Sequence, residues 1–203
     1  MEIGGWTVII PVKPALSAKS RLGRGPELAR ALALDTVAAV VACSVVSRVV
    51  VVTADVGFRP PGVDIARERS PQGIDAAVRT GTALVVGDAV AAPRAALLGD
   101  LPSLRPEDLA AALALAAPHS RAFVADREST GTTLVTAATG MSLLTAFGPG
   151  SAAAHRGLGL VQLDLPVGST VTVDVDTVEQ LDRARVLGLG PATLATLAAL
   201  AAR

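Results

Sequence analysis

The chain has 203 residues, 51% of them hydrophobic, which is enough for one sizeable core and favours a single domain over 1–203. Its 18 basic residues balance 18 acidic ones, which excludes the extended positive field of a protein that coats nucleic acid or an anionic membrane. Aromatic residues make up only 2% of the chain, so stacking platforms for single-stranded nucleic acid are nearly absent and any anion site must be local.

Short apolar runs rich in β-branched residues alternate with longer Ala/Leu segments along the chain. This alternation predicts an α/β fold with a mostly parallel central sheet flanked by helices. The expected strands are 6–12, 48–54, 63–66, 95–99, 121–126, 160–165 and 171–175. The expected helices begin near Pro26, Gly73, Pro106, Ser151 and Thr177, and a last one follows Pro191 in a C-terminal helical tail over 189–203. That apolar tail should pack on the domain or on a second subunit.

A basic turn follows the first expected strand. Ligands of open α/β sheets bind beyond the carboxyl ends of the strands, so polar residues just after each apolar run are the candidates for function. Lys13, Lys19, Ser20 and Arg21, with backbone amides leading into the helix at Pro26, could surround a polyphosphate. A merely solvated basic turn is an equally good interpretation.

Three aspartates suggest a metal site. Asp100 ends the expected strand 95–99 in the segment GDLP, too far from the helix at Pro106 for simple capping. In VTVDVDT, strand period two puts Asp174 and Asp176 on one face, where a divalent cation would offset their repulsion. Such an all-oxygen site suits Mg²⁺. An exposed edge strand whose last residues cap the next helix is as good an account of the second motif alone.

The segment 129–157 interrupts the alternation with Gly, Thr and Ser, as a substrate loop would. It contains TGTT, 130–133, and then FGPGS, in which Gly148 and Gly150 precede a helix expected to start at Ser151. Unpaired amides at that helix start would make an anion site. An ordinary Ser N-cap is the simpler alternative, and His155 in the same helix is interpreted as structural.

The only cysteine, Cys43, lies in an apolar run that predicts a buried helix, so we expect a structural thiol in a reducing environment. No apolar run reaches the roughly 18 residues that span a bilayer, and the first residues do not have the pattern of a signal peptide. We therefore expect a soluble, cytoplasmic protein that binds neither membrane nor nucleic acid.

Together, the segments VIIPVKPALSAKSRL, GDLP, TGTT, FGPGSAAAHR and VTVDVDT resemble, in that order, the CofC/FbiD guanylyltransferases of coenzyme F-420 biosynthesis. The resemblance covers the chain up to about the helix at Thr177. It implies a single nucleotidyltransferase domain of the glycosyltransferase-A-like type. In that family GTP reacts with phosphoenolpyruvate or 2-phospho-L-lactate to give a GDP-linked acid and pyrophosphate.

The resemblance also implies roles for individual residues. Thr133, Gly148 and Ser151 would contact the acid; Asp100, Asp174 and Asp176 would hold Mg²⁺; and Lys13, Lys19, Ser20 and Arg21 would contact the nucleotide phosphates. Gly73 and Asp75 would lie at the base or ribose.

The sequence departs from the family at two of these places. Ser129 stands where the family often has glycine before TGTT, which could narrow the loop. Asp75 in PQGIDAA stands where the family has asparagine in a Gly-Leu-Asn helix start. A carboxylate can accept from guanine N1 and N2 but donates nothing, so the preference for guanine is less secure than the type of reaction.

Several alternatives stay open on the sequence. Phosphoenolpyruvate is favoured over 2-phospho-L-lactate only because the composition is typical of an actinobacterium. A nucleotidyltransferase with another substrate is less favoured because a Gly-rich LxAGxxxRxG loop is missing, and a catalytically silent nucleotide-binding partner is a third hypothesis. A homodimer and a downstream transferase of the same pathway are the protein partners considered.

Overall fold

The computed structural model describes residues 5–12, 25–85 and 92–202, and within them a seven-stranded sheet has the order β3-β2-β1-β4-β6-β5-β7. The strands are β1 (Trp6–Pro11), β2 (Val46–Thr53), β3 (Asp64–Arg67), β4 (Arg94–Leu97), β5 (Arg121–Ala125), β6 (Thr132–Ala137) and β7 (Val161–Gln162). Every pairing is parallel except those that β6 makes with β4 and β5. The predicted mostly parallel α/β sheet is confirmed.

Each predicted helix is present and begins within one residue of its expected start. The helices are α1 (Gly25–Ala42), α2 (Ile74–Leu84), α3 (Pro106–Ala116), α4 (Ser151–Gly157), α5 (Val178–Leu187) and α6 (Pro191–Ala201), with a short 3-10 helix η2 (Thr170–Thr172) before α5. Proline stands at the start of α3 and α6, where its missing N–H costs no helical hydrogen bond. The start signals in the sequence were therefore reliable.

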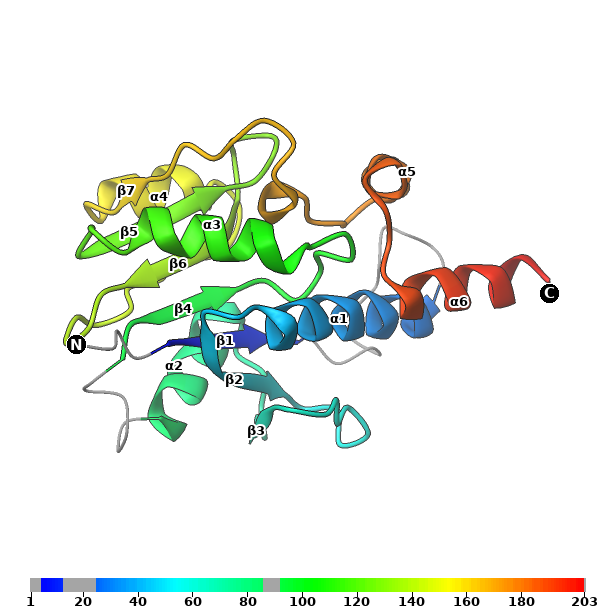
Figure 1. Cartoon of the computed structure of the whole chain (residues 1–203). Helices are drawn as coiled ribbons and strands as arrows, with labels where there is room; N and C mark the ends of the chain where they lie inside the picture. Colours follow the sequence, from blue (N-terminus) through cyan, green and yellow to red (C-terminus); the bar gives the residue numbers. More distant parts are fainter. Residues whose placement is uncertain (1–4, 13–24, 86–91, 203) are drawn as a thin grey trace.

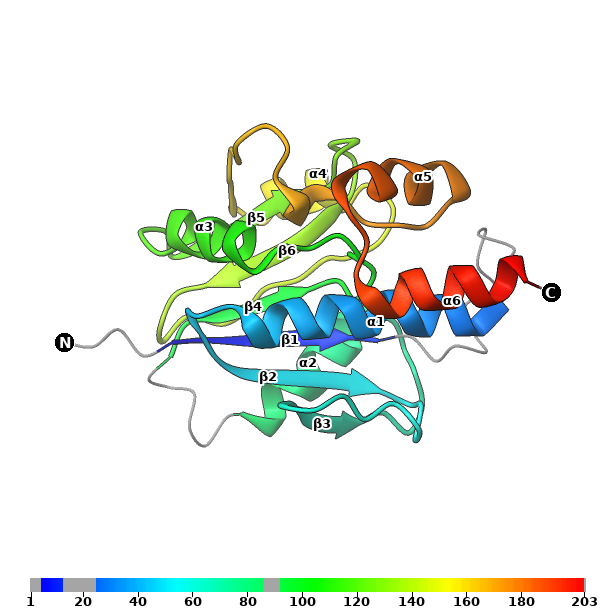
Figure 2. The same ribbon diagram turned by 45° about the vertical axis from the view of Figure 1, so that its right-hand side comes forward.

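The helices cover both faces of the sheet (Figures 1 and 2). Successive strand residues point to opposite faces, so Val8 and Ile10 pack in one cluster with residues of α1 and α3. Ile9 packs on the other face with Ala77 of α2. On that same face, at the far half of the sheet, Ala152 of α4 packs in a further cluster around β5 and β6. The result is a three-layer α/β/α arrangement.

Strand β6 is an element that the sequence analysis placed inside an irregular loop. All six of its residues are buried, and three of them are threonines. The β-branched threonine side chain suits a strand, and Thr136 Oγ1 donates to the carbonyl of Ala122 on β5 at 3.3 Å, so its hydroxyl is satisfied inside the sheet. Because its threonines also fit a loop, this central strand was not predicted.

The expected strand 171–175 was wrong. The segment instead forms η2 and then an extended stretch without strand pairing. The carboxylate of Asp108 accepts from both the N–H and the hydroxyl of Thr170, at 2.9 and 2.6 Å, and holds the chain in this tight turn. Burial still alternates along 171–176, so the valines and the polar residues point to opposite sides as predicted, although the segment is not a strand.

The C-terminal tail packs on its own domain, because α6 lies along α1 in both views (Figures 1 and 2). Buried Asp35 of α1 accepts from the first amides of α6, Ala192 N at 2.9 Å and Thr193 N at 2.7 Å. Gly190, just before these residues, packs directly against Asp35: a Cβ at position 190 would lie 2.2 Å from Asp35 Cγ. The carboxylate thus caps the helix in place of an N-cap side chain.

Cys43 follows the last residue of α1 and is buried, and its burial raises the pKa of the thiol. This agrees with a structural thiol. In the described part of the chain, no helix combines the length and the apolar character that a membrane-spanning helix needs.

Candidate active site

Strand β6 brings the TGTT segment, 130–133, to the carboxyl edge of the sheet. Because β6 runs antiparallel to β4 and β5, its first residues lie where those two strands end. The N–H of Leu98 donates to the carbonyl of Thr133 at 2.9 Å, one residue before the GDLP segment 99–102 begins. The two segments therefore meet at the edge where α/β proteins bind ligands.

Asp100 lies beside the segment that carries the other two predicted metal ligands. The N–H of Val175 donates to the carbonyl of Asp100 at 3.0 Å. On either side of Val175, Asp174 is partly buried and Asp176 is exposed. The fold thus brings these three aspartates, separated by more than 70 positions, to one place; their coordination of a metal stays a prediction.

The electrostatic environment of Asp174 disfavours its charged form. Burial, together with the nearby negative charges of Asp126, Asp176 and Glu128, raises its pKa to about 6. Its buried Oδ1 accepts no hydrogen bond from the described residues. One oxygen each of Asp126, Glu128 and Asp174 lies within 4.8 Å of the other two. A divalent cation would relieve both the repulsion and the unmet acceptor, so this donor set fits one.

The two neighbouring carboxylates are engaged within the chain. Glu128 pairs with Arg183 of α5 at 2.9 Å, at the surface. Asp126 accepts from the N–H groups of Thr130 and Gly131 at 2.9 and 2.8 Å. Asp174 is the member of this acidic group whose buried oxygen has no such partner. A small cavity beside it is lined by Arg127, Glu128, Val173, Asp174, Gln180 and Arg183.

The bonds to Asp126 fix the shape of the loop before β6. A Cβ on Gly131 would lie 2.4 Å from Asp126 Oδ2, so only glycine fits there. Ser129 has φ of +60°, a left-handed conformation that favours glycine. This explains physically why glycine suits that position; serine keeps the same backbone turn at some cost.

Thr133 is fully buried, and its hydroxyl has no hydrogen-bond partner among the described residues. Such an atom costs free energy unless a ligand or water completes it. Its neighbour Thr132 is buried as well, but the hydroxyl of Thr132 contacts His155. Thr133 is thus the threonine of this strand start whose hydroxyl lacks a partner, and its contact with a substrate stays a prediction.

The start of α4 differs from the expectation of free amides. Ser151 N donates to Gly148 O at 3.1 Å, and Ala152 N donates to Thr130 O at 3.2 Å, so the prediction of unpaired amides is wrong for these two residues. Gly150, in the left-handed region with φ of 73°, is the N-cap, and Ser151 is the buried first residue of the helix. The bond from Ala152 nevertheless ties α4 to the TGTT loop.

Gly73 and Asp75 lie at the start of α2. Gly73 is the N-cap with φ of 96°, and nothing would contact a Cβ there. Asp75 Oδ1 accepts from the N–H of Phe147 at 3.0 Å. The structure therefore links the predicted nucleotide position to the FGPG segment, a contact that the sequence did not reveal.

His155 is buried and neutral. Its Nε2 accepts from Ala146 N at 2.9 Å, so the proton resides on Nδ1, which faces Thr132 Oγ1 at 2.9 Å. Burial lowers the pKa of the ring, against the opposing charge of Asp75. The structural interpretation of His155 agrees with this geometry.

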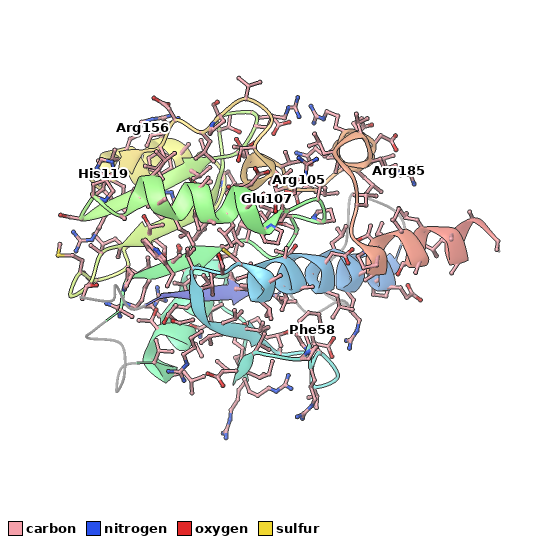
Figure 3. All side chains as sticks on the ribbon, in the orientation of Figure 1. Phe58, Arg105, Glu107, His119, Arg156 and Arg185 are labelled. Atoms are coloured by element: carbon pink, nitrogen blue, oxygen red, sulfur yellow. The ribbon has the colours of Figure 1, made fainter. Side chains whose placement is uncertain are left out.

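Arg156 is at the surface of α4 (Figure 3), where its Nε donates to Gln162 Oε1 at 2.9 Å. The predicted phosphate residues Lys13, Lys19, Ser20 and Arg21 lie outside the described residues.

Sequence reasoning missed Asp126 and Glu128. The signal was present, because Asp126 ends the expected strand 121–126 just as Asp100 follows its own strand. Applying the same carboxyl-end rule to every strand would have selected it.

No protein-family model matches the chain. Individual curated proteins, however, are similar to it over almost its whole length. A phosphoenolpyruvate guanylyltransferase of Streptomyces scabiei is 45% identical over 209 residues, covering 96% of this chain and 97% of the relative. One from Streptomyces coelicolor is 43% identical, with the same coverage of each chain. The chain belongs to the phosphoenolpyruvate guanylyltransferase (CofC) family. The resemblance drawn from the sequence motifs is confirmed.

Solved structures agree on the fold of this guanylyltransferase family member. A protein of Desulfovibrio desulfuricans G20, described as a nucleotide-diphospho-sugar transferase, superposes with a TM-score of 0.70 at 16% identity, covering 97% of this chain and 95% of its own. A 4-diphosphocytidyl-2C-methyl-D-erythritol synthase superposes with a TM-score of 0.60 at 15% identity, covering 90% and 98%. The single-domain nucleotidyltransferase fold follows from these likenesses.

Proposed function

We propose that this protein transfers GMP from GTP to the phosphate of phosphoenolpyruvate, forming enolpyruvoyl-diphospho-guanosine and pyrophosphate. The observation that carries the proposal is the relation to phosphoenolpyruvate guanylyltransferases over almost the whole length of both chains. The names of these relatives favour phosphoenolpyruvate over 2-phospho-L-lactate. The reaction would serve coenzyme F-420 biosynthesis, with a downstream transferase consuming the product.

The chemistry needs no general base from the protein. The second pKa of a phosphate monoester is about 6, so the acceptor oxygen is already ionised at neutral pH. It attacks the α-phosphorus of GTP, one P–O bond forms, and the bond to the β-phosphate oxygen breaks to release pyrophosphate. Positioning and charge neutralisation then supply the catalysis.

Each group of residues has a proposed part in that reaction. Thr133, with its unmet buried hydroxyl, would bind the acid together with Gly148 and Ser151. Lys13, Lys19, Ser20 and Arg21 would contact the triphosphate, and Gly73 with Asp75 the base or ribose. Asp174 would hold Mg²⁺ through its buried oxygen, together with Asp100 and Asp176, and the neighbouring Asp126 and Glu128 would add negative charge around the same ion. Bound Mg²⁺ would offset the negative charge of the phosphates.

The test is a matrix of substrates. Purified protein with Mg²⁺ is incubated with each of four nucleoside triphosphates and either acid, pyrophosphate is assayed, and product masses are measured. We expect turnover with GTP and phosphoenolpyruvate and the mass of the guanylated acid. No pyrophosphate with any pair, or a preference for another nucleotide, would overturn the proposal. Both acids offered together to GTP decide which acceptor is used.

A further inference from the structure

His155 joins two separate segments, the start of β6 and the loop before α4. Its Nδ1 contacts Thr132 Oγ1 on β6, directly beside Thr133, and its Nε2 accepts from Ala146 N, two residues before Gly148. Both segments carry residues proposed to bind the acid. A single buried ring thus connects the two sides of the proposed acid site.

The orientation of the ring is fixed from several directions. Phe123 of β5 lies 5.6 Å from it between ring centroids, and Phe147 packs edge-on at 5.4 Å. Because Nε2 must accept from Ala146, the ring has to be neutral with its proton on Nδ1. Both ring nitrogens of His155 therefore have polar partners, which a side chain that only filled the core would not require.

The next amide along the chain is held as well. Phe147 N donates to Asp75 Oδ1 on α2, so two successive N–H groups, those of Ala146 and Phe147, end on side chains from different elements. Gly148 follows with φ of 136°, a conformation that residues with a Cβ rarely adopt. Because glycine has many backbone conformations open to it, the two hydrogen bonds just before it help to fix its position.

We propose that His155 is a positioning residue for the acceptor acid: it fixes the 146–148 backbone against β6 and so sets the spacing between Gly148 and Thr133. The inference rests on the proposed function of those two residues. It assigns to His155 no contact with substrate and no proton transfer.

The test compares two replacements that keep different halves of the imidazole. In His155→Gln the side-chain oxygen can reach the Nε2 position and accept from Ala146 N, whereas in His155→Asn only the Nδ1 position is reproduced. KM and kcat are measured for phosphoenolpyruvate and GTP separately. We expect H155N to raise KM for the acid about tenfold, the effect of losing one buried hydrogen bond, while KM for GTP changes less than about twofold. H155Q should recover most of that loss.

His119→Asn is the matched control. His119 lies before β5, at the opposite end of that strand from Asp126, and Figure 3 shows it far from α5 and α6. The same replacement there should leave both KM values unchanged. Thermal unfolding of each variant shows whether it is folded.

Clear results would overturn the inference. An unchanged KM for the acid in H155N, equal increases for both substrates, or equal impairment of H155Q and H155N would each contradict it. If H155N does not fold, Thr132→Val against Thr132→Ser tests the other contact of the ring, the one made by Nδ1, and a smaller but still selective rise in KM for the acid is expected in the valine variant alone. Failure of the proposed function is separate, since the wild-type protein would then show no turnover with GTP and the acid.

Discussion

The two sides of the candidate site differ in how their polar groups are satisfied. Around β6 and α4, the buried polar atoms mostly have partners within the chain, through His155, Asp75 and Asp126. At Asp174, a buried carboxylate oxygen has none among the described residues and lies among like charges. The proposed acid site is thus held together by hydrogen bonds within the chain, whereas the proposed metal site keeps an unmet acceptor among like charges.

The largest effect should come from removing the unfavourable charge. Asp174→Asn keeps the shape of the side chain but removes its negative charge, so we expect pyrophosphate release to fall on the order of 100-fold to 1,000-fold, because metal-assisted charge stabilisation is worth several kcal/mol. Steady-state assay with GTP and phosphoenolpyruvate measures this. Asp164→Asn, at an exposed position outside the acidic group, is the control. Near-normal turnover in D174N would show that Asp174 does not hold the metal.

The same substitution should stabilise the metal-free protein. The folded-state pKa of Asp174 is raised to about 6 from 3.8, so its favourable contribution is complete below pH 3.8 and is lost as pH rises through 6. At pH 8 the wild-type carboxylate therefore costs up to about 3 kcal/mol, which D174N should recover. Denaturant unfolding in EDTA at pH 8 and pH 4 measures the difference. A variant that is equally or less stable at pH 8, or whose gain does not shrink at pH 4, would contradict the unfavourable environment.

Gly131→Ala tests the side held by hydrogen bonds. Its Cβ would collide with Asp126 Oδ2, so we expect a loss of about 1–3 kcal/mol in the free energy of unfolding. Gly157→Ala is the matched control, since nothing lies within 4 Å of a Cβ there and alanine at the last residue of α4 should leave the free energy of unfolding unchanged or slightly raised. Chemical denaturation compares the two variants. Equal stability would mean that the Asp126 loop is not closely packed.

Ser129 should give the smallest effect. Ser129→Gly relieves the left-handed backbone but adds freedom to the unfolded chain, so the free energy of unfolding should change by less than about 0.5 kcal/mol. Ser129→Val, whose β-branched side chain disfavours φ of +60°, should lose about 1–3 kcal/mol. Thermal unfolding resolves the pair. Similar stability of both variants would mean that the loop adjusts its backbone.

Local signals predicted most of the fold. Proline, glycine, serine and threonine at the helix starts located each described α-helix, since those signals act within one turn. Strand β6 was missed because two of its threonines, Thr132 and Thr136, find their partners in other elements, which no local pattern shows. The expected strand at 171–175 failed for the same reason, because Asp108, some 60 residues earlier, determines the turn at Thr170.

The candidate site was predicted in part. Motif positions gave Thr133 and Asp174, whose unmet buried oxygens fit the expected roles. Asp126 could have been found from its place at the end of a strand, whereas the ties made by His155 depend on contacts with Thr132 and Ala146, 23 and 9 positions away. A polar residue at the end of a strand can be recognised in a sequence, but a hydrogen bond between two loops cannot.

The cap that Asp35 provides for α6 has a consequence for the order in which the protein folds. Asp35 and Ala192 are 157 positions apart, so α1 emerges early during synthesis while its helical partner emerges near the end. Until then, Leu28 and Leu32 of α1 lack Leu197 as a neighbour, and Asp35 remains hydrated. A nascent chain stalled before α6 would show an apolar strip to chaperones, and release of the last helix would remove that strip in one step.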